Sequence, residues 1–127
     1  MHADDNKLNE LSRGVIGCAF IVRNALGAGF LEKVYENALA HELRKQGLAI
    51  AQQHGITVTY DGTVLGEYFL DLLVEEMLLL ALKAVKVLDE AHRAQCLNYL
   101  KATGLQLCLL LNFGKPRLEI KRVANRL

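Results

Sequence analysis

The sequence predicts one α/β domain over residues 1–127, a mixed β-sheet flanked by helices in the order α-α-β-β-β-α-β-β. Three observations predict it: helix-period apolar stripes at the start, alternating β-branched residues with a hairpin signal in the middle, and a capped helix before two last strands. With 127 residues, 52% hydrophobic residues and a formal net charge of +1, the chain is sized for one domain and excludes disorder.

The N-terminal part of the chain predicts two helices joined by a glycine-rich turn. Apolar residues recur at three- and four-residue steps from Leu8 to Leu26 and again from Phe30 to Gln46. Asp5 or Asn6 is the expected N-cap of the first helix, and the glycines of segment 27–29 are expected to end it.

The rest of the chain predicts five strands and one further helix. The first strand is expected at Ile56–Tyr60, with the preceding residues up to His54 in a loop, and Asp61-Gly62 is a hairpin signal. The following elements are expected at 65–74 and 78–87 (strands), 89–103 (a helix capped by Asp89), and 105–112 and 118–123 (strands). A three-residue turn at 75–77 would pair residue 74 with 78, 72 with 80, and 71 with 81.

Two charged residues stand out on strands that otherwise read as buried. The strand from Leu78 is apolar on both faces, as a central strand would be, yet it carries Lys83, and its neighbour carries Asp71 between apolar residues. A charge on a buried strand must be paired, neutralised or solvated through a pocket. The simple structural reading is a buried ion pair between Asp71 and Lys83, and the functional reading is a site.

Four short motifs together suggest a family. They are Gly29-Phe30-Leu31-Glu32-Lys33-Val34-Tyr35, of the form GxxExxY, Leu-Asn-Tyr-Leu-Lys-Ala-Thr-Gly at 97–104, Leu-Asn-Phe-Gly at 111–114 and Leu-Glu-Ile-Lys-Arg-Val at 118–123. In this combination the chain resembles the small bacterial GxxExxY protein family, which is placed in the PD-(D/E)XK nuclease superfamily. The resemblance covers nearly the whole chain.

The resemblance implies a restriction-endonuclease-like core and a site that cleaves phosphodiesters with Mg²⁺ or Mn²⁺. The catalytic positions it implies are Glu32, Asp71, Lys83, Gln95 and Tyr99, and the implied metal ligands are Asp71, Glu32 and the backbone carbonyl of Leu82. Ala81 departs from the pattern, because the family has a Glu-x-Lys motif whose glutamate would stand at this position as a further ligand. Loss of that carboxylate predicts weaker metal binding.

Some of these residues also have ordinary structural readings. Glu32 falls in the first turn of a helix, where the helix dipole favours an acidic residue. Tyr99 lies one helical turn after Gln95 and has the spacing of a core aromatic residue with its hydroxyl at the edge.

The C-terminal segment carries a basic strip of Lys115, Arg117, Lys121 and Arg122. These side chains are a candidate contact for a nucleic-acid backbone. A solvated edge strand protected by charge explains them equally well.

The sequence thus predicts a nuclease-like protein with metal-dependent phosphodiester hydrolysis of nucleic acid, impaired by Ala81. The alternative is a non-catalytic nucleic-acid-binding or assembly protein that retains the nuclease fold. The longest apolar run, Met77–Leu82, is too short for a membrane span, and the polar start lacks a signal peptide, so a cytoplasmic protein is expected. A homodimer is a further expectation, and Cys18, Cys96 and Cys108 are expected to be buried thiols.

Overall fold

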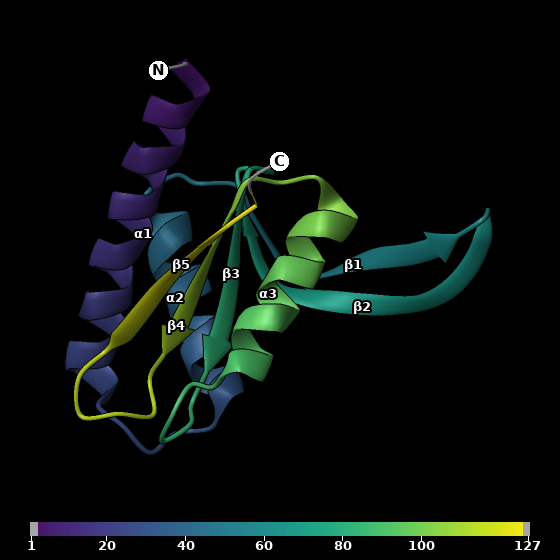
Figure 1. Cartoon of the computed structure of the whole chain (residues 1–127). Coiled ribbons are helices and arrows are strands. Elements are labelled where there is room, and N and C mark those ends of the chain that lie inside the picture. Colours follow the sequence, from purple (N-terminus) through teal and green to yellow (C-terminus); the bar gives the residue numbers. More distant parts are fainter. Residues whose placement is uncertain (1–2, 126–127) are drawn as a thin grey trace.

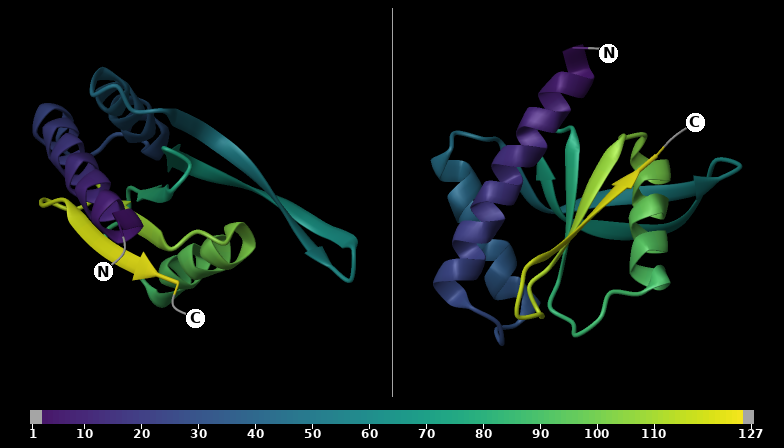
Figure 2. Two further views of the ribbon diagram at one scale, coloured as in Figure 1. Left: turned by 90° about the horizontal axis from the view of Figure 1, so that it is seen from above. Right: turned by 60° about the vertical axis from the view of Figure 1, so that its left-hand side comes forward.

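A computed structural model describes residues 3–125 of the chain, which form a five-stranded sheet between helices (Figure 1). The elements are α1 (Ala3–Leu26), α2 (Glu32–Lys45), β1 (Ile50–Tyr60), β2 (Thr63–Val74), β3 (Leu78–Lys83), α3 (Glu90–Thr103), β4 (Leu107–Asn112) and β5 (Glu119–Ala124). Helices α1 and α2 lie on one face of the sheet and α3 lies on the other, as Figure 2 shows from two further directions. The expected fold class and element order are confirmed.

The sheet has the spatial order β1-β2-β3-β4-β5, in which β3 and β4 are parallel and the other neighbours are antiparallel. Strand β3 contributes to two apolar cores. Leu80 and Leu82 pack with residues of α1 and α2, whereas Leu79 and Ala81 pack with residues of α3. The prediction of a central strand covered on both faces is therefore confirmed, because parallel pairing places the crossover helix α3 over the sheet.

The predicted register between β2 and β3 is also confirmed where the two strands pair. Val74 pairs with Leu78 and Leu72 with Leu80. The turn between them is tight because Glu75 and Glu76 both adopt positive φ (53° and 56°) and the Met77 N–H donates to the Val74 carbonyl at 3.0 Å. The Leu72–Leu80 pair is the last one between the two strands. The part of β2 that precedes Leu72 lies away from β3 and pairs only with β1, and together they form a two-stranded arm (Figures 1 and 2).

Several element boundaries differ from the predictions, and three of them bear on the site or on a predicted residue. Helix α1 already begins at Ala3, beyond the predicted cap at Asp5 or Asn6, since acidic residues are favourable in a first turn. Strand β1 begins at Ile50, so His54 lies in a strand, because pairing with β2 orders a polar stretch that shows no alternation. Strand β3 ends at Lys83 rather than near residue 87.

The loop after β3 departs from the sheet because a buried side chain holds it. The Asn112 side chain is fully buried, accepts from the Val85 N–H at 3.0 Å and donates to the Val85 carbonyl at 2.9 Å. Gly114 lies against the same segment, and a Cβ there would stand 2.4 Å from the Val85 nitrogen. The Leu-Asn-Phe-Gly motif therefore fixes the backbone directly after Lys83.

The three cysteines are buried and free, as predicted. No helix within residues 3–125 has the length and apolar character needed to cross a membrane.

Candidate functional site at the fork between two strands

Asp71 lies at the fork where β2 leaves β3. Its Oδ2 accepts a hydrogen bond from the Leu82 N–H at 2.8 Å, so the carboxylate satisfies an N–H of β3 beyond the last paired residues. Continuing the register by one residue places Asp71 opposite Ala81. Burial raises the pKa of this carboxyl, and the neighbouring Glu36 charge raises it too, against the lowering effect of the Leu82 hydrogen bond.

Gln53 of β1 faces Asp71 from the other side of the fork. The pairs Gln52–Leu72 and His54–Leu70 leave Gln53 and Asp71 opposite each other but outside the ladder, and Gln53 has a φ of 51°. Its side-chain nitrogen donates to Glu36 Oε1 at 2.7 Å and lies 3.5 Å from Asp71 Oδ1. A non-glycine residue at positive φ stores strain, and such strain gathers at functional sites.

Glu36 of α2 completes this network. It is only 3% exposed, and its carboxylate also accepts from Gln52 at 2.8 Å and from Lys33 at 2.9 Å. Sequence reasoning missed Glu36 and Gln53. Glu36 follows Glu32 at i+4 on one helix face, which is a visible signal, whereas the strained backbone of Gln53 leaves no signal in the sequence.

Glu32 and Lys83 stand near Asp71, as the electrostatics of Glu32 shows. Burial raises the pKa of the half-buried Glu32 carboxyl, the Lys83 charge lowers it, and the Asp71 charge raises it. The charge of Lys83 likewise lowers the pKa of Asp71. The structure thus brings together three of the predicted site residues, from α2, β2 and β3, at one end of the sheet.

The predicted ion pair between Asp71 and Lys83 is absent. The ion pairs formed within residues 3–125 include neither side chain. The physical reason lies in the hydrogen bonds of Asp71, because its two oxygens face the Leu82 N–H and the Gln53 amide. The ammonium group of Lys83 therefore stays available for another anion.

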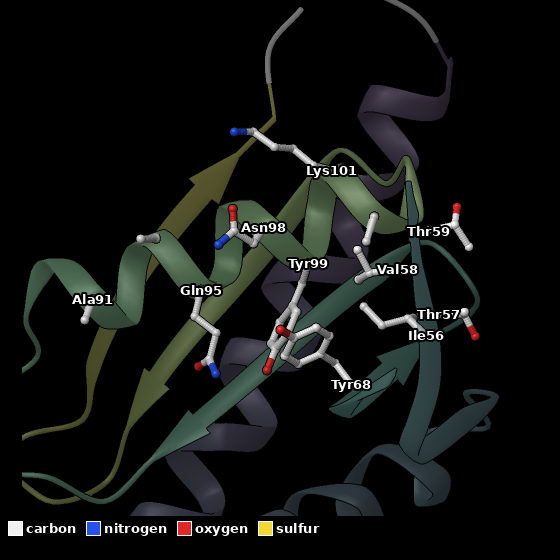
Figure 3. Close-up of a pocket in the computed structure, with 12 residues that line it drawn as sticks. Ile56, Thr57, Val58, Thr59, Tyr68, Ala91, Gln95, Asn98, Tyr99 and Lys101 are labelled. Atoms are coloured by element: carbon white, nitrogen blue, oxygen red, sulfur yellow. The ribbon is translucent and has the colours of Figure 1, made fainter. Parts of the chain in front are cut away.

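Gln95 and Tyr99 project from α3 towards the arm, one helical turn apart (Figure 3). They line a groove of about 760 Å³ between α3 and the arm, whose other wall carries Tyr68 and Thr57. Burial, followed by the negative charge of Asp71, raises the pKa of Tyr99, so the groove borders the carboxylate site. Tyr99 thus links the group of Glu32, Asp71 and Lys83 to the groove.

A family model described as the PD-(D/E)XK nuclease superfamily matches residues 9–123. The chain belongs to the PD-(D/E)XK nuclease superfamily. This match spans all the site residues named above and agrees with the order of helices and strands. Comparisons with curated proteins and with solved structures gave no match.

Nucleases of this superfamily generally use Mg²⁺ or Mn²⁺, and the donor set of this chain falls short of holding one tightly. Within residues 3–125 no three acidic, histidine or cysteine side chains gather as metal ligands do. Ala81 presents a methyl group, 5% exposed, where a further carboxylate would stand. The remaining predicted ligands are Asp71, Glu32 and the Leu82 carbonyl, and both oxygens of Asp71 already face N–H donors.

Within the superfamily domain, the tyrosine of the GxxExxY segment has a structural role. The Tyr35 hydroxyl donates to the Gly27 carbonyl at 2.6 Å and accepts from the Phe30 N–H at 3.2 Å. Its ring stacks on Phe113 with centroids 4.7 Å apart. Tyr35 thereby ties the turn before α2 to the residue that follows β4 and sets the position at which α2 presents Glu32.

The basic strip lies at the opposite edge of the sheet from the arm. Lys115 pairs with Glu119 at 3.7 Å, and the Arg122 guanidinium donates to Ser12 at 2.9 Å and to Asn9 at 3.2 Å. Arg117 and Lys121 are exposed. Because β3 and β4 lie between this strip and the strand of Asp71 in the sheet order, the structure does not bring it into the site.

Proposed function

We propose that the protein is a nucleic-acid-binding member of the GxxExxY family whose phosphodiester cleavage is impaired. One observation supports the proposal: the paired residues of β2 and β3 end at Leu72 and Leu80, and extending that register by one residue sets Ala81 opposite Asp71, two residues before Lys83. By this register the position of the expected glutamate carries a methyl group. The site keeps the means to contact a phosphate while it lacks a ligand.

The residues of the site divide into two roles. Lys83, which forms no ion pair within residues 3–125, is the cation that meets a phosphate oxygen, and Gln95 of the groove donates amide hydrogen bonds to the same ligand. Glu32 and Asp71 are the carboxylates of the former metal site. In an intact site of this type a divalent ion activates water and stabilises charge on the phosphate, and Ala81 withdraws part of its binding.

The decisive experiment restores the missing carboxylate. Ala81→Glu is compared with Ala81→Gln, which has nearly the same volume and no charge, and with the wild-type chain. Each protein is incubated with single- and double-stranded DNA and RNA in Mg²⁺, in Mn²⁺ and in chelator. We expect metal-dependent cleavage from Ala81→Glu, at least about tenfold faster than from the other two proteins.

Two outcomes contradict the proposal. Equal cleavage by wild type and Ala81→Gln would show that the site does not need a carboxylate at this position. If circular dichroism shows that Ala81→Glu is folded but the variant neither cuts nor binds any nucleic acid, the site is not a disabled nuclease site. A role in assembly would then gain support.

Binding by the wild-type chain is tested separately in chelator. Lys83→Met keeps the length of the side chain and removes its charge. We expect it to weaken binding of a labelled oligonucleotide about fivefold to tenfold, because one charge-assisted contact to phosphate is lost. Lys86→Met is the matched control, since Lys86 is exposed in the loop that follows β3.

A further inference from the structure

The arm formed by the outer parts of β1 and β2 exposes more apolar surface than the rest of the sheet. Tyr60, Val64, Leu65, Tyr68 and Phe69 are each between 50% and 68% exposed. A two-stranded ribbon is marginally stable by itself in water, and such an apolar surface marks a place where something binds.

One wall of this arm faces α3 across the groove. In Figure 3, Tyr99 points from α3 to Tyr68 of the arm, Gln95 extends from the same side of the helix, and the Lys101 side chain extends away from Tyr68. Asn98 also lines the groove. The Tyr68 and Tyr99 rings lie 6.1 Å apart at their centroids and are tilted by 58°. The groove thus offers two aromatic faces with amide groups beside them.

The charge of the groove suits a nucleic-acid ligand that directs its bases, rather than its phosphates, into the groove. None of the residues that line it is acidic, and Lys101 is its charged member. Thr57, Gln95 and Asn98 supply donors and acceptors of the kind that meet base edges. Tyr99 lines the groove and also lies close enough to Asp71 to feel its charge, so a strand in the groove would continue towards that carboxylate.

We infer that the groove holds two or three unstacked nucleotides of a single-stranded nucleic acid, with bases against Tyr68 and Tyr99. This inference rests on the proposed function and names its substrate class. The volume of about 760 Å³ is of the size that encloses a small ligand and suits this short stretch. Aromatic stacking of this kind is sequence-tolerant, because every base has a π-face.

A duplex fits this surface poorly. Its bases are already stacked on one another, so tyrosines can reach their faces only after they are unstacked. Binding a duplex also requires several lysines or arginines for the phosphates, and the sequence has none between Lys45 and Lys83. The arm carries Asp61 and Glu67 instead.

The test measures fluorescence anisotropy of labelled oligonucleotides with the full chain in chelator. Single-stranded DNA, single-stranded RNA and a duplex of the same sequence are compared. Tyr68→Ala is expected to weaken single-strand binding about 5- to 100-fold, and Tyr68→Phe to retain it, since the ring stacks without its hydroxyl. Tyr60→Ala is the matched control, because Tyr60 is a 68% exposed tyrosine of the arm outside the groove.

Salt provides a second readout. If Lys83 and Lys101 are the two cations that meet phosphates, the logarithm of the affinity should fall with the logarithm of the salt concentration at a slope of about −1.4. A slope several times steeper would overturn the inference, because bulk phosphate contacts would then dominate. Equal losses of single-strand affinity in Tyr60→Ala and Tyr68→Ala would also overturn the inference.

The outcomes separate this inference from the proposed function. If the chain binds the duplex in a way that depends on Lys83 and does not bind single strands, the inference about the groove is wrong and the proposed function still holds. No binding of any of the three oligonucleotides overturns both.

Discussion

Replacing Gln53 by glycine separates the two features that this residue combines, a strained backbone and a bridging amide. Gln53 has a φ of 51°, and its side-chain nitrogen donates to Glu36 at 2.7 Å and lies near Asp71 at 3.5 Å. Glycine adopts positive φ without steric cost but removes the amide. Gln53→Ala removes the amide and keeps the strain, so the pair isolates each contribution.

The expected magnitude follows from these contacts. A hydrogen bond to a charged group contributes about 1.5 to 3 kcal/mol, and the lower end applies because Gln53 is exposed. Relief of the positive φ gains about 1 kcal/mol, which the conformational entropy of glycine offsets by about 0.5 to 1 kcal/mol. Gln53→Gly should therefore lower the free energy of unfolding by about 1 to 1.5 kcal/mol, and Gln53→Ala, which keeps the strain and loses only the hydrogen bond, by about 1.5 kcal/mol.

Urea unfolding measures the two free energies, and carboxyl ¹³C NMR measures the titration of Asp71. The amide of Gln53 lowers the pKa of Asp71, so both variants should raise that pKa. The reasoning would be refuted if Gln53→Gly were at least as stable as the wild-type chain while Asp71 titrated unchanged. Gln53 would then be only a backbone position, and the fork would be held by Leu82 alone.

Two further predictions concern stability. Because the pKa of Asp71 is raised, the native state binds the proton of this carboxyl more tightly than the unfolded state does. The stabilisation that this proton gives is complete below about pH 3.9 and is lost as pH rises through the native pKa of Asp71. Asp71→Asn can still accept the hydrogen bond from the Leu82 N–H. Its free energy of unfolding, measured with urea, should rise relative to that of the wild-type chain between about pH 4 and about pH 7. A difference in free energy of unfolding that stays the same over this pH range would count against the prediction. Gly114→Ala should lower the free energy of unfolding by about 3 kcal/mol or more, because its Cβ would stand 2.4 Å from the Val85 nitrogen. A thermal midpoint within about 2 °C of wild type would contradict this close packing of Gly114 against Val85.

Much of the fold was predictable because it depends on local patterns. The order of elements follows from apolar periodicity, and the buried character of β3 follows from its unbroken run of apolar residues. The register that sets Asp71 against Ala81 follows from the length of one turn, residues 75–77, since a shift of one residue would turn every side chain of β2 to the other face. For these reasons the positions of Glu32, Asp71 and Lys83 near one another could be predicted from a family motif.

The surroundings of those residues could not be predicted, because they depend on where strand pairing stops. Nothing in the sequence indicates that β2 pairs with β3 only from Leu72 onward. The separation of the two strands before Leu72 creates both the fork at Asp71 and the arm that faces α3. The same separation explains why Asp71 bonds to Leu82 rather than to Lys83.

The sequence by itself determined the order of the helices and strands and the charged positions of the site, since local spacing and the register of one turn decide these. Only the tertiary structure decided what those charges touch. The packing of the sheet and helices placed Gln53 and Glu36 beside Asp71, left Lys83 outside the ion pairs of residues 3–125 and opened a groove along Tyr99. Contacts between distant segments of this kind arise from the way the layers pack.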